Sequence, residues 1–259
     1  MNVLLRGFMV IALLFVCSCD ERPSEQRIVF GTSADYPPFE FYKNGEITGF
    51  EIDLANAIAR ELGKIVKFKD MSFPSMFSSL QNGTIDVAVA SITPTDERRE
   101  LYDFTEPYHV SAIVLVYKQN ERLNIKNLSG ETIACQLGST QERWVKEKLP
   151  QVKIISIDNV VRAAEFVKSG QVIGIVVDEL VAVSLCNEHT ELKYFVLAKP
   201  EDLSRNSCGT ALAVKKGNAV MLNAMNTAIK KLTDNGEFLR IKEKWGIKDI
   251  SSETETPNE

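Results

Sequence analysis

The stretch "SITPTDERRELYDFTEPY" at residues 91–108 follows directly on the apolar run "IDVAVA" at residues 85–90. The run predicts a buried strand, so the hydroxyl side chains that follow stand at the end of that strand. Arg98 comes five residues after Thr93, and its planar guanidinium suits bidentate binding of a carboxylate. The segment therefore predicts an anion site. The candidate residues are Ala90 and Ser91, through backbone N–H groups, with Thr93 and Arg98.

A plainer interpretation of the same segment is open. Thr95, followed by two acids, is typical of a helix N-cap, which places Arg98 near the beginning of a short charged helix. In that case Arg98 is a surface arginine paired with Glu97 or Glu100. The remainder of the chain has to distinguish the two interpretations.

Composition excludes some classes of function. The chain has 259 residues, of which 44% are hydrophobic and 25% charged, an ordinary globular composition that suits one large domain or two modest ones. The net charge of −5 and the pI of about 5.3 exclude an overall basic surface of the kind that binds nucleic acid or attaches to a membrane by charge. We therefore expect no nucleic-acid partner.

The N-terminus has the pattern of an export signal. Residues 8–17 are all apolar, a run too short to span a bilayer as a helix but suited to the core of a signal peptide. The run ends in "VCSC", which resembles the lipobox of bacterial lipoproteins, so we expect removal of residues 1–18 and a lipid on Cys19. The alternative is a soluble secretory signal cut near Ser18. Residues 19–26 are polar, as expected of a tether between lipid and domain.

Export to an oxidising compartment leaves three cysteines, which permit one disulfide and one free thiol. Cys135 lies in an apolar strand pattern and is expected to be a buried thiol, so Cys186 and Cys208 are the candidate pair. His109 and His189 are far apart in the sequence, and cysteines without clustered histidines do not predict a metal site.

Short β-branched runs alternate with amphipathic helix patterns from Arg27 onward. This alternation predicts an α/β architecture of parallel sheets covered by helices. The pattern runs twice, to about residue 108 and again to about residue 207, which predicts two lobes and a cleft. The tail at 248–259 is expected to be disordered. The expected strands are 27–32, 65–70, 85–90, 111–117, 132–137, 152–157, 172–177 and 210–215, and the expected helices are 50–63, 73–81, 141–149, 160–169, 218–234 and 237–245.

Two segments of the second half also follow expected strands, where open α/β sheets bind their ligands. The segment "QLGSTQE" at 136–142 places Ser139 and Thr140 at the N-terminus of a helix that begins near Gln141, and exposed N–H groups there bind anions. It is not a nucleotide loop, because the GKS/T ending is absent. Asp178 directly follows "VIGIVV". It either caps the next helix or, if it faces a cleft, receives an ammonium group.

The segment "GTSADYPPFEF" at residues 31–41 follows the first expected strand. Its turn presents Tyr36 at the end of that strand, either as a core aromatic in a rigid loop or as one wall of a site. Two candidate sites for a carboxylate and one acid for an ammonium together describe the backbone end of a free α-amino acid.

The chain resembles the polar amino-acid-binding subfamily of ABC-transporter solute-binding proteins over residues 27–247. The motifs that carry the resemblance are "GTSADYPPFEF", "GEITGFEIDLANAIARELG", "GTIDVAVASITPTDERRELYDFTEPY", "LGSTQE", "VVDE" and "DNGEFLRIKEKWG". The resemblance implies a bilobal type II periplasmic-binding-protein fold, in which two α/β lobes are joined by two crossover strands near residues 108–113 and 207–212. The implied segments are 27–108 plus 212–247 for lobe 1 and 113–207 for lobe 2.

The resemblance also implies roles for residues of the cleft. Arg98 and Thr93 hold the α-carboxylate of the ligand, and Thr140 joins them from the other lobe. Asp178 takes the α-ammonium. No cofactor is implied.

The side chain of the ligand is expected to lie between Tyr36 and Phe73. Histidine- and glutamine-type relatives carry an aspartate where this chain has Ser33, so one contact is lost or reassigned. Asp35 and Glu40 in the same loop are alternative acids for a cationic side chain. The segment "YPPFE" is most similar to that of arginine binders, so the resemblance favours a basic amino acid, arginine first, with lysine, ornithine, histidine and glutamine as the other candidates. The predicted ligand-binding residues are Ser33, Tyr36, Glu40, Phe73, Ala90, Ser91, Thr93, Arg98, Gln136, Ser139, Thr140, Gln141 and Asp178.

The predicted protein is thus a periplasmic lipoprotein, anchored to a bacterial membrane by the lipid on Cys19, that delivers an amino acid to an ABC permease in the inner membrane. It is not expected to be an enzyme. Two alternatives remain. Some dehydratases of aromatic amino-acid biosynthesis use the same bilobal scaffold, so the fold alone does not decide. The cleft also suits the ligand-sensing subunit of a receptor.

Overall fold

The structure is a computed structural model that describes residues 26–203 and 209–247. The predicted signal peptide, the lipidation site Cys19, the tether up to residue 25, Cys208 and the tail at 248–259 lie outside the described residues, so they remain predictions. Within the described ranges, no helix has the length and apolar character needed to cross a membrane.

The first five-stranded sheet forms the core of lobe 1, with strand order β5-β1-β6-β13-β7. β1 pairs in parallel with β5 and β6, whereas β13 pairs antiparallel with β6 and β7. The strands are β1 (Arg27–Thr32), β5 (Ile65–Asp70), β6 (Val87–Ala88), β7 (Tyr102–Phe104) and β13 (Ala213–Lys215). The helices of this lobe are α1 (Phe50–Glu61), α2 (Phe73–Gln81), α3 (Asp96–Leu101), α7 (Ala219–Asp234) and α8 (Glu237–Lys244).

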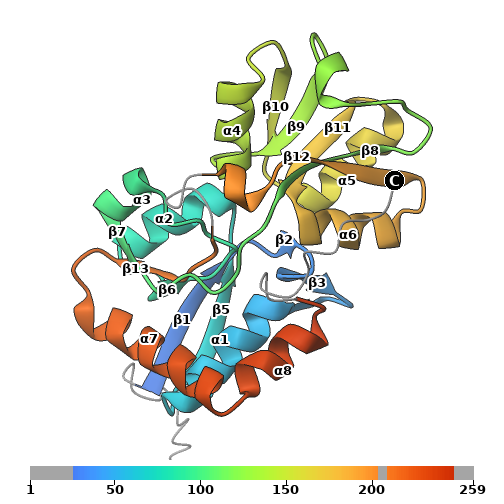
Figure 1. Cartoon of the computed structure of the whole chain (residues 1–259). Coiled ribbons are helices and arrows are strands. Elements are labelled where there is room, and N and C mark those ends of the chain that lie inside the picture. The colour runs from blue at the N-terminus through green and yellow to red at the C-terminus, as the bar shows by residue number, and fades with distance from the viewer. Residues whose placement is uncertain (1–25, 204–208, 248–259) are drawn as a thin grey trace, which may run out of the picture.

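The second five-stranded sheet forms lobe 2, with strand order β10-β9-β11-β8-β12. β9, β10 and β11 are parallel, and β8 pairs antiparallel with β11 and β12. The strands are β8 (Ile113–Lys118), β9 (Thr132–Gln136), β10 (Lys153–Ile157), β11 (Gly174–Asp178) and β12 (Leu192–Ala198). The helices are α4 (Thr140–Lys148), α5 (Val160–Ser169) and α6 (Glu179–Glu188), with short 3₁₀ turns η2 (Ile125–Asn127) and η3 (Pro200–Asp202). Figure 1 shows this lobe above lobe 1.

The two segments that join the lobes lie side by side. Thr105 N–H donates to Leu212, Tyr108 N–H donates to Thr210, and Thr210 N–H donates back to His109. His109 and Thr210 form an antiparallel bridge. The lobes are therefore connected by a paired, two-segment crossover, as the fold class predicts.

A third, small antiparallel sheet orders the loop after β1. It consists of β2 (Asp35–Tyr36), β3 (Glu40–Lys43) and β4 (Glu46–Thr48). Tyr36 is directly opposite Glu40 in this sheet, and directly opposed residues project from the same face. The loop that carries Tyr36 is therefore held by backbone pairing.

The local sequence explains the helices. In α1, the residues Ile52, Leu54, Ala55 and Ile58 are buried, as the spacing of apolar residues predicts. The largest buried apolar cluster contains residues of both sheets, such as Ile28 of β1 and Val177 of β11. The two lobes therefore pack against each other through apolar side chains as well as polar ones.

The sequence prediction differs from the structure in three respects. Each large sheet is mixed rather than purely parallel, because β7, β8, β12 and β13 run against their neighbours. The apolar run at 85–90 forms only the two-residue strand β6, since the chain leaves the sheet at the site. The strands of the small sheet, together with β7 and β12, were not predicted, because they are short or only partly buried.

The cysteines follow the prediction in part. Cys135 is fully buried in β9, and burial raises the pKa of its thiol to about 12. Cys186 is a free thiol on α6 and packs against the main core. The predicted pair of Cys186 with Cys208 involves a residue outside the described ranges, so it stays a prediction. The described residues contain no cluster of three or more His, Cys, Asp or Glu side chains that could hold a metal.

Gly49, which joins β4 to α1, offers a test of how closely this junction packs against the loop at Phe39. An added Cβ would lie 2.1 Å from the carbonyl oxygen of Phe39, at a φ of +138°. We expect Gly49→Ala to lower the free energy of unfolding by about 3 kcal/mol, through overlap and backbone strain. Gly45→Ala is the control, because Gly45 also has a positive φ (+84°) but no atom within 4 Å of the added carbon. We expect a loss of about 1 kcal/mol there. Urea unfolding measures both, and equal losses would contradict the overlap.

Candidate ligand-binding site between the lobes

A narrow cavity lies between the lobes. Its wall comes from the carboxyl ends of strands β6, β9 and β11, from the starts of helices α2, α3 and α4, and from β2. Eleven of the thirteen predicted site residues line it. They are Tyr36, Phe73, Ala90, Ser91, Thr93, Arg98, Gln136, Ser139, Thr140, Gln141 and Asp178.

Arg98 reaches from lobe 1 to the edge of lobe 2. Its Nη1 donates to the carbonyl oxygen of Thr93 (2.8 Å), and its Nη2 donates to the carbonyl oxygen of Gly138 (3.0 Å). A guanidinium has five N–H donors, so donors remain for an anion in the cavity. The alternative interpretation, in which Arg98 pairs with Glu97 or Glu100, does not hold among the described residues. Both hydrogen bonds of the Arg98 guanidinium go to backbone carbonyls, and Glu97 pairs with Arg143.

Two aromatic rings support the guanidinium. The Cζ atom of Arg98 lies 5.3 Å from the ring centroid of Phe73 and 5.0 Å from that of Phe77, within the range of cation–π attraction. Burial lowers the pKa of Arg98 to about 10, so the group stays cationic at neutral pH. The sequence interpretation missed Phe77. Its signal was the spacing of four residues from Phe73, which puts both rings on one face of α2.

Asp178 is the acid that lines the cavity from lobe 2. It occupies the N-cap position of α6, but its side chain makes no capping hydrogen bond. Instead, its Oδ2 accepts from the Tyr36 hydroxyl (3.0 Å) and its Oδ1 accepts from Nε2 of Gln141 (2.8 Å). A carboxylate has about four acceptor positions, so the cavity face of Asp178 retains capacity for an ammonium group.

Ser91 stands on the wall with an unusual backbone. Its φ is +47°, in the left-handed region that residues other than glycine rarely occupy. Its N–H donates to Oε2 of Glu51 (2.8 Å). The prediction that Ser91 offers this N–H to an anion is therefore wrong, because a buried carboxylate takes it. The Ser91 hydroxyl is buried and has no hydrogen-bond partner among the residues that the structure describes.

The loop before α4 is fixed by one acid that the sequence interpretation missed. Glu142 accepts the Gly138 N–H through Oε2 (2.8 Å), and its own N–H donates to the Ser139 hydroxyl (3.0 Å). Ser139 is thus the N-cap of α4. This arrangement aims the Gly138 carbonyl at Arg98 and leaves Thr140 on the cavity wall.

Ser33 and Glu40 are the two predicted residues that the structure does not bring to the cavity wall. The Ser33 hydroxyl donates to Oδ1 of Asp35 (3.0 Å), and Oδ2 of Asp35 accepts the Val160 N–H (2.7 Å). Glu40 has only 1% of its surface exposed. Burial, together with the neighbouring carboxylate of Glu51, raises the pKa of Glu40 well above its ordinary value.

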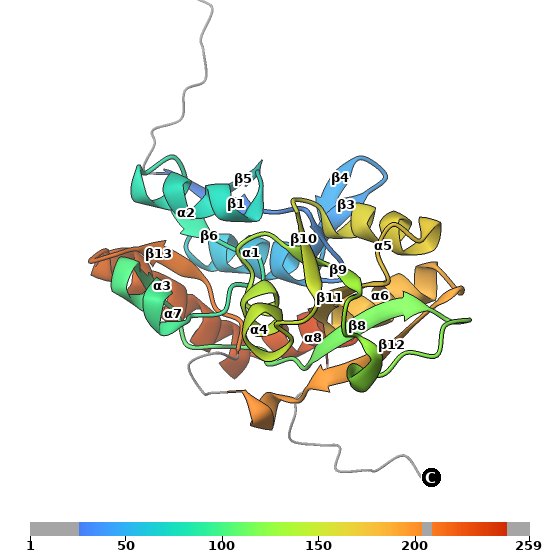
Figure 2. The same ribbon diagram turned by 90° about the horizontal axis from the view of Figure 1, so that it is seen from above.

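Among the described residues, four pairs make polar contacts across the boundary between the lobes, in addition to the apolar packing. They are Tyr36 with Asp178, Asp35 with the Val160 N–H, Arg98 with the Gly138 carbonyl, and Glu97 with Arg143 (2.7 Å). The last contact joins α3 and α4, which lie on the same side of the molecule (Figure 2). The structure therefore has the lobes closed around the cavity.

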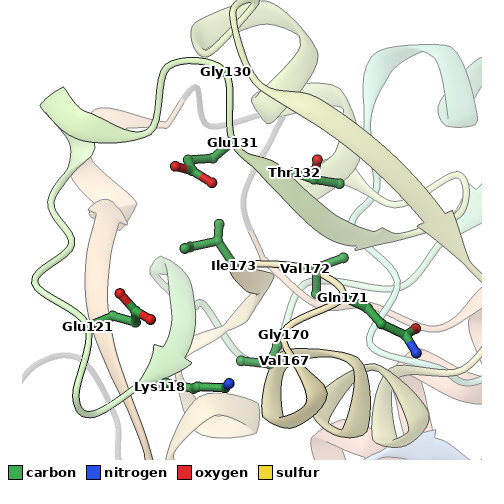
Figure 3. A pocket seen from close by; sticks show the side chains of 10 residues that line it. All are labelled: Lys118, Glu121, Gly130, Glu131, Thr132, Val167, Gly170, Gln171, Val172 and Ile173. Carbon is green, nitrogen blue, oxygen red and sulfur yellow. The ribbon is translucent and has the colours of Figure 1, made fainter.

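A larger cavity, of about 260 Å³, lies within lobe 2 (Figure 3). Its lining includes Lys118 at the carboxyl end of β8 and Thr132 and Ile173 at the amino ends of β9 and β11. It is thus at the opposite end of the sheet from the interlobe cavity. Glu121 and Glu131 also line it, but none of the predicted site residues does.

Comparison with known proteins fits this geometry. Residues 28–248 match the bacterial extracellular solute-binding proteins of family 3. The chain belongs to this family. The arginine-binding extracellular protein ArtP of Bacillus subtilis is 31% identical over 238 residues, which cover 90% of this chain and 92% of the relative.

Solved structures give the same result. An ancestral arginine-binding protein bound to arginine is 36% identical, with a TM-score of 0.78 over 85% of this chain and 98% of that one. An ancestral amino acid-binding protein described as a precursor of cyclohexadienyl dehydratase is 31% identical, with a TM-score of 0.75 over 85% of this chain and 96% of that one. The similarity confirms the type II periplasmic-binding-protein fold. The relatives are binding proteins of ABC transporters for amino acids, arginine-binding ones among them.

The carboxyl of Asp178 makes stability depend on pH. Burial raises its pKa from 3.8 to about 6. Between these values the native state holds a proton that the unfolded chain has lost, so this group lowers the free energy of unfolding as pH rises through the window. Asp178→Asn removes this contribution. We expect the wild type to lose stability relative to the variant by up to about 1.4 kcal/mol per pH unit in the window. Urea unfolding of the ligand-free proteins between pH 4 and pH 7 measures the difference, and parallel curves would contradict the assignment.

Proposed function

We propose that this protein is an extracytoplasmic solute-binding lipoprotein of an ABC importer, which binds one free polar amino acid between its lobes and delivers it to a membrane permease. The observation that carries the proposal is the position of Arg98 and Asp178. They come from different lobes, carry opposite charges and line the same narrow cavity.

The charges on the wall match the two ends of a zwitterion. Arg98 retains free N–H donors beside Thr93, Ser91 and Thr140, which supports this group as the site of the α-carboxylate. Asp178 retains acceptor capacity and supports the α-ammonium. A charge that is buried without a partner is strongly unfavourable, so a ligand with both charges, correctly spaced, is selected over ligands with one.

Arginine is the ligand we propose first. Several relatives are named as arginine-binding. The carboxyl groups of Asp35, Glu40, Glu51 and Asp178 lie close enough to influence one another's pKa. A cationic ligand side chain beside them would offset the raised pKa values, because an opposite charge favours the ionised form of a carboxyl. The aromatic rings of Tyr36 and Phe73 offer it apolar walls.

A thermal-shift panel tests the proposal directly. The twenty amino acids, ornithine and citrulline are each added to the purified protein, and a ligand at about a thousand times its Kd should stabilise the native state by about 4 kcal/mol. We expect the largest shift with L-arginine. No shift with any of them would overturn the proposal. Prephenate and arogenate form a separate arm, in which product formation would identify the dehydratase alternative instead.

Arg98 and Arg99 form a matched pair for mutagenesis. Arg98→Ala should weaken L-arginine binding by about 2–5 kcal/mol, because the ligand carboxylate loses its buried partner. Arg99 is on the same helix, but it is exposed, packs over Phe104 and donates to the Pro94 carbonyl. Arg99→Ala should therefore leave the Kd within about twofold of wild type, a surface effect. Isothermal titration calorimetry measures both, and equal losses would show that Arg98 is not the anion clamp.

The membrane anchor is proposed on Cys19. We expect Cys19→Ser to abolish incorporation of radiolabelled palmitate in bacteria and to release the protein from the membrane fraction. Cys17→Ser is the control and should keep the label, because the small residue Ser18 precedes Cys19. Persistent labelling of the Cys19→Ser variant would contradict the anchor.

A further inference from the structure

Glu51 is a buried carboxylate that connects two parts of the molecule. It is the second residue of α1 and has no exposed surface. Its Oε2 accepts the N–H of Ser91 on the cavity wall (2.8 Å), and its Oε1 accepts the hydroxyl of Tyr108 (2.5 Å). One side chain thus holds two donors that are far apart in the sequence.

The first donor belongs to a strained segment. Ser91 has its backbone at a φ of +47°, a conformation of non-glycine residues that persists only when the surroundings hold it. The bond from Ser91 N–H to Glu51 is a contact of this kind. It fixes the turn that leaves the Ser91 hydroxyl on the wall of the cavity, where that hydroxyl has no partner in the described part of the chain.

The second donor belongs to the crossover between the lobes. Tyr108 donates its backbone N–H to Thr210 of the other connecting segment, and His109 bridges to the same residue. The ring of Tyr108 packs against Phe50 and Phe238. Tyr108 does not line the cavity. Its position relative to the cavity wall is therefore set through Glu51.

We infer that Glu51 is a positioning residue that couples the ligand-contacting turn at Ser91 to the interlobe crossover at Tyr108, so that the cavity wall and the crossover change conformation together. The inference rests on the proposed function, because the coupling matters when the lobes open and close around a ligand. Glu51 itself contacts no ligand. It acts through the two groups that donate to it.

The first experiment needs no ligand. Amide hydrogen exchange is measured by NMR for Ser91, Tyr108 and Thr210 in the wild type and in Glu51→Gln. The amide side chain of the variant has one acceptor oxygen instead of two. We expect exchange at all three amides to rise together, about tenfold or more, while the core amides of lobe 2 are unchanged. A rise at Ser91 alone, or no rise at all, would overturn the coupling.

The second experiment uses Tyr108→Phe, which removes only a hydroxyl outside the cavity. We expect the Kd for L-arginine to rise about three- to tenfold, and we expect the double variant with Glu51→Gln to bind no more weakly than Glu51→Gln alone. The matched control is Tyr194→Phe on β12. It removes a contact (3.5 Å) between the tyrosine hydroxyl and the carboxylate of Glu179 on α6. It should leave the Kd unchanged.

The outcomes separate the two proposals. If the wild type binds no amino acid, the proposed function fails, and the amide exchange still decides whether the coupling exists. If the wild type binds L-arginine and Tyr108→Phe lowers stability to urea without changing the Kd, the tyrosine is only a structural support and the coupling is refuted. Because Tyr108→Phe keeps the ring packing on Phe50 and Phe238, the test does not depend on the folding of Glu51→Gln.

Discussion

The arrangement of the cavity depends on one electrostatic constraint: a charge removed from water needs a partner. Arg98 and Asp178 enter the same small space from different lobes. In the closed structure each is satisfied only by neutral groups. Arg98 donates to two backbone carbonyls, and Asp178 accepts from a hydroxyl and an amide. These contacts satisfy hydrogen bonding without neutralising the charges, and burial accordingly moves the pKa of both groups toward their neutral forms.

The fold supplies this geometry through the ends of its strands. β6 leads into the turn that carries Ser91 and Thr93, and β9 and β11 lead into Gln136 and Asp178. Because β9 and β11 are parallel neighbours, their carboxyl ends meet at one edge of the sheet. The same edge of lobe 1 faces them across the crossover. The antiparallel strands that the sequence interpretation did not foresee leave this edge unchanged, since they add to the far side of each sheet.

Residues near the ends of apolar runs could be placed from the sequence. Asp178 directly follows such a run, and Thr93 and Thr140 follow within three residues. The α/β class followed from the same runs, whereas the two-lobed fold rested on the family resemblance. The positions of Ser33 and Glu40 off the cavity wall were not predictable, since they depend on the contact of Ser33 with Asp35 and on the burial of Glu40 in the packed structure. The hydrogen bond from the Ser91 N–H to Glu51 connects residues 40 positions apart in the sequence. No local pattern in the sequence marks such a contact.

The closed cavity also shows how binding and closure are linked. A ligand shifts a conformational equilibrium only through contacts that differ between the states. Tyr36 and Gln141 hold Asp178 with dipoles, whereas an ammonium would hold it with a full charge, and charge-assisted hydrogen bonds are about twice as strong as neutral ones. The same comparison applies to Arg98. A carboxylate would accept stronger hydrogen bonds from its guanidinium than the two backbone carbonyls do. The gain is largest when both ends are engaged at once, and that requires both lobes. Under the proposed function, a zwitterion would therefore stabilise the closed form more than the protein's own polar groups do.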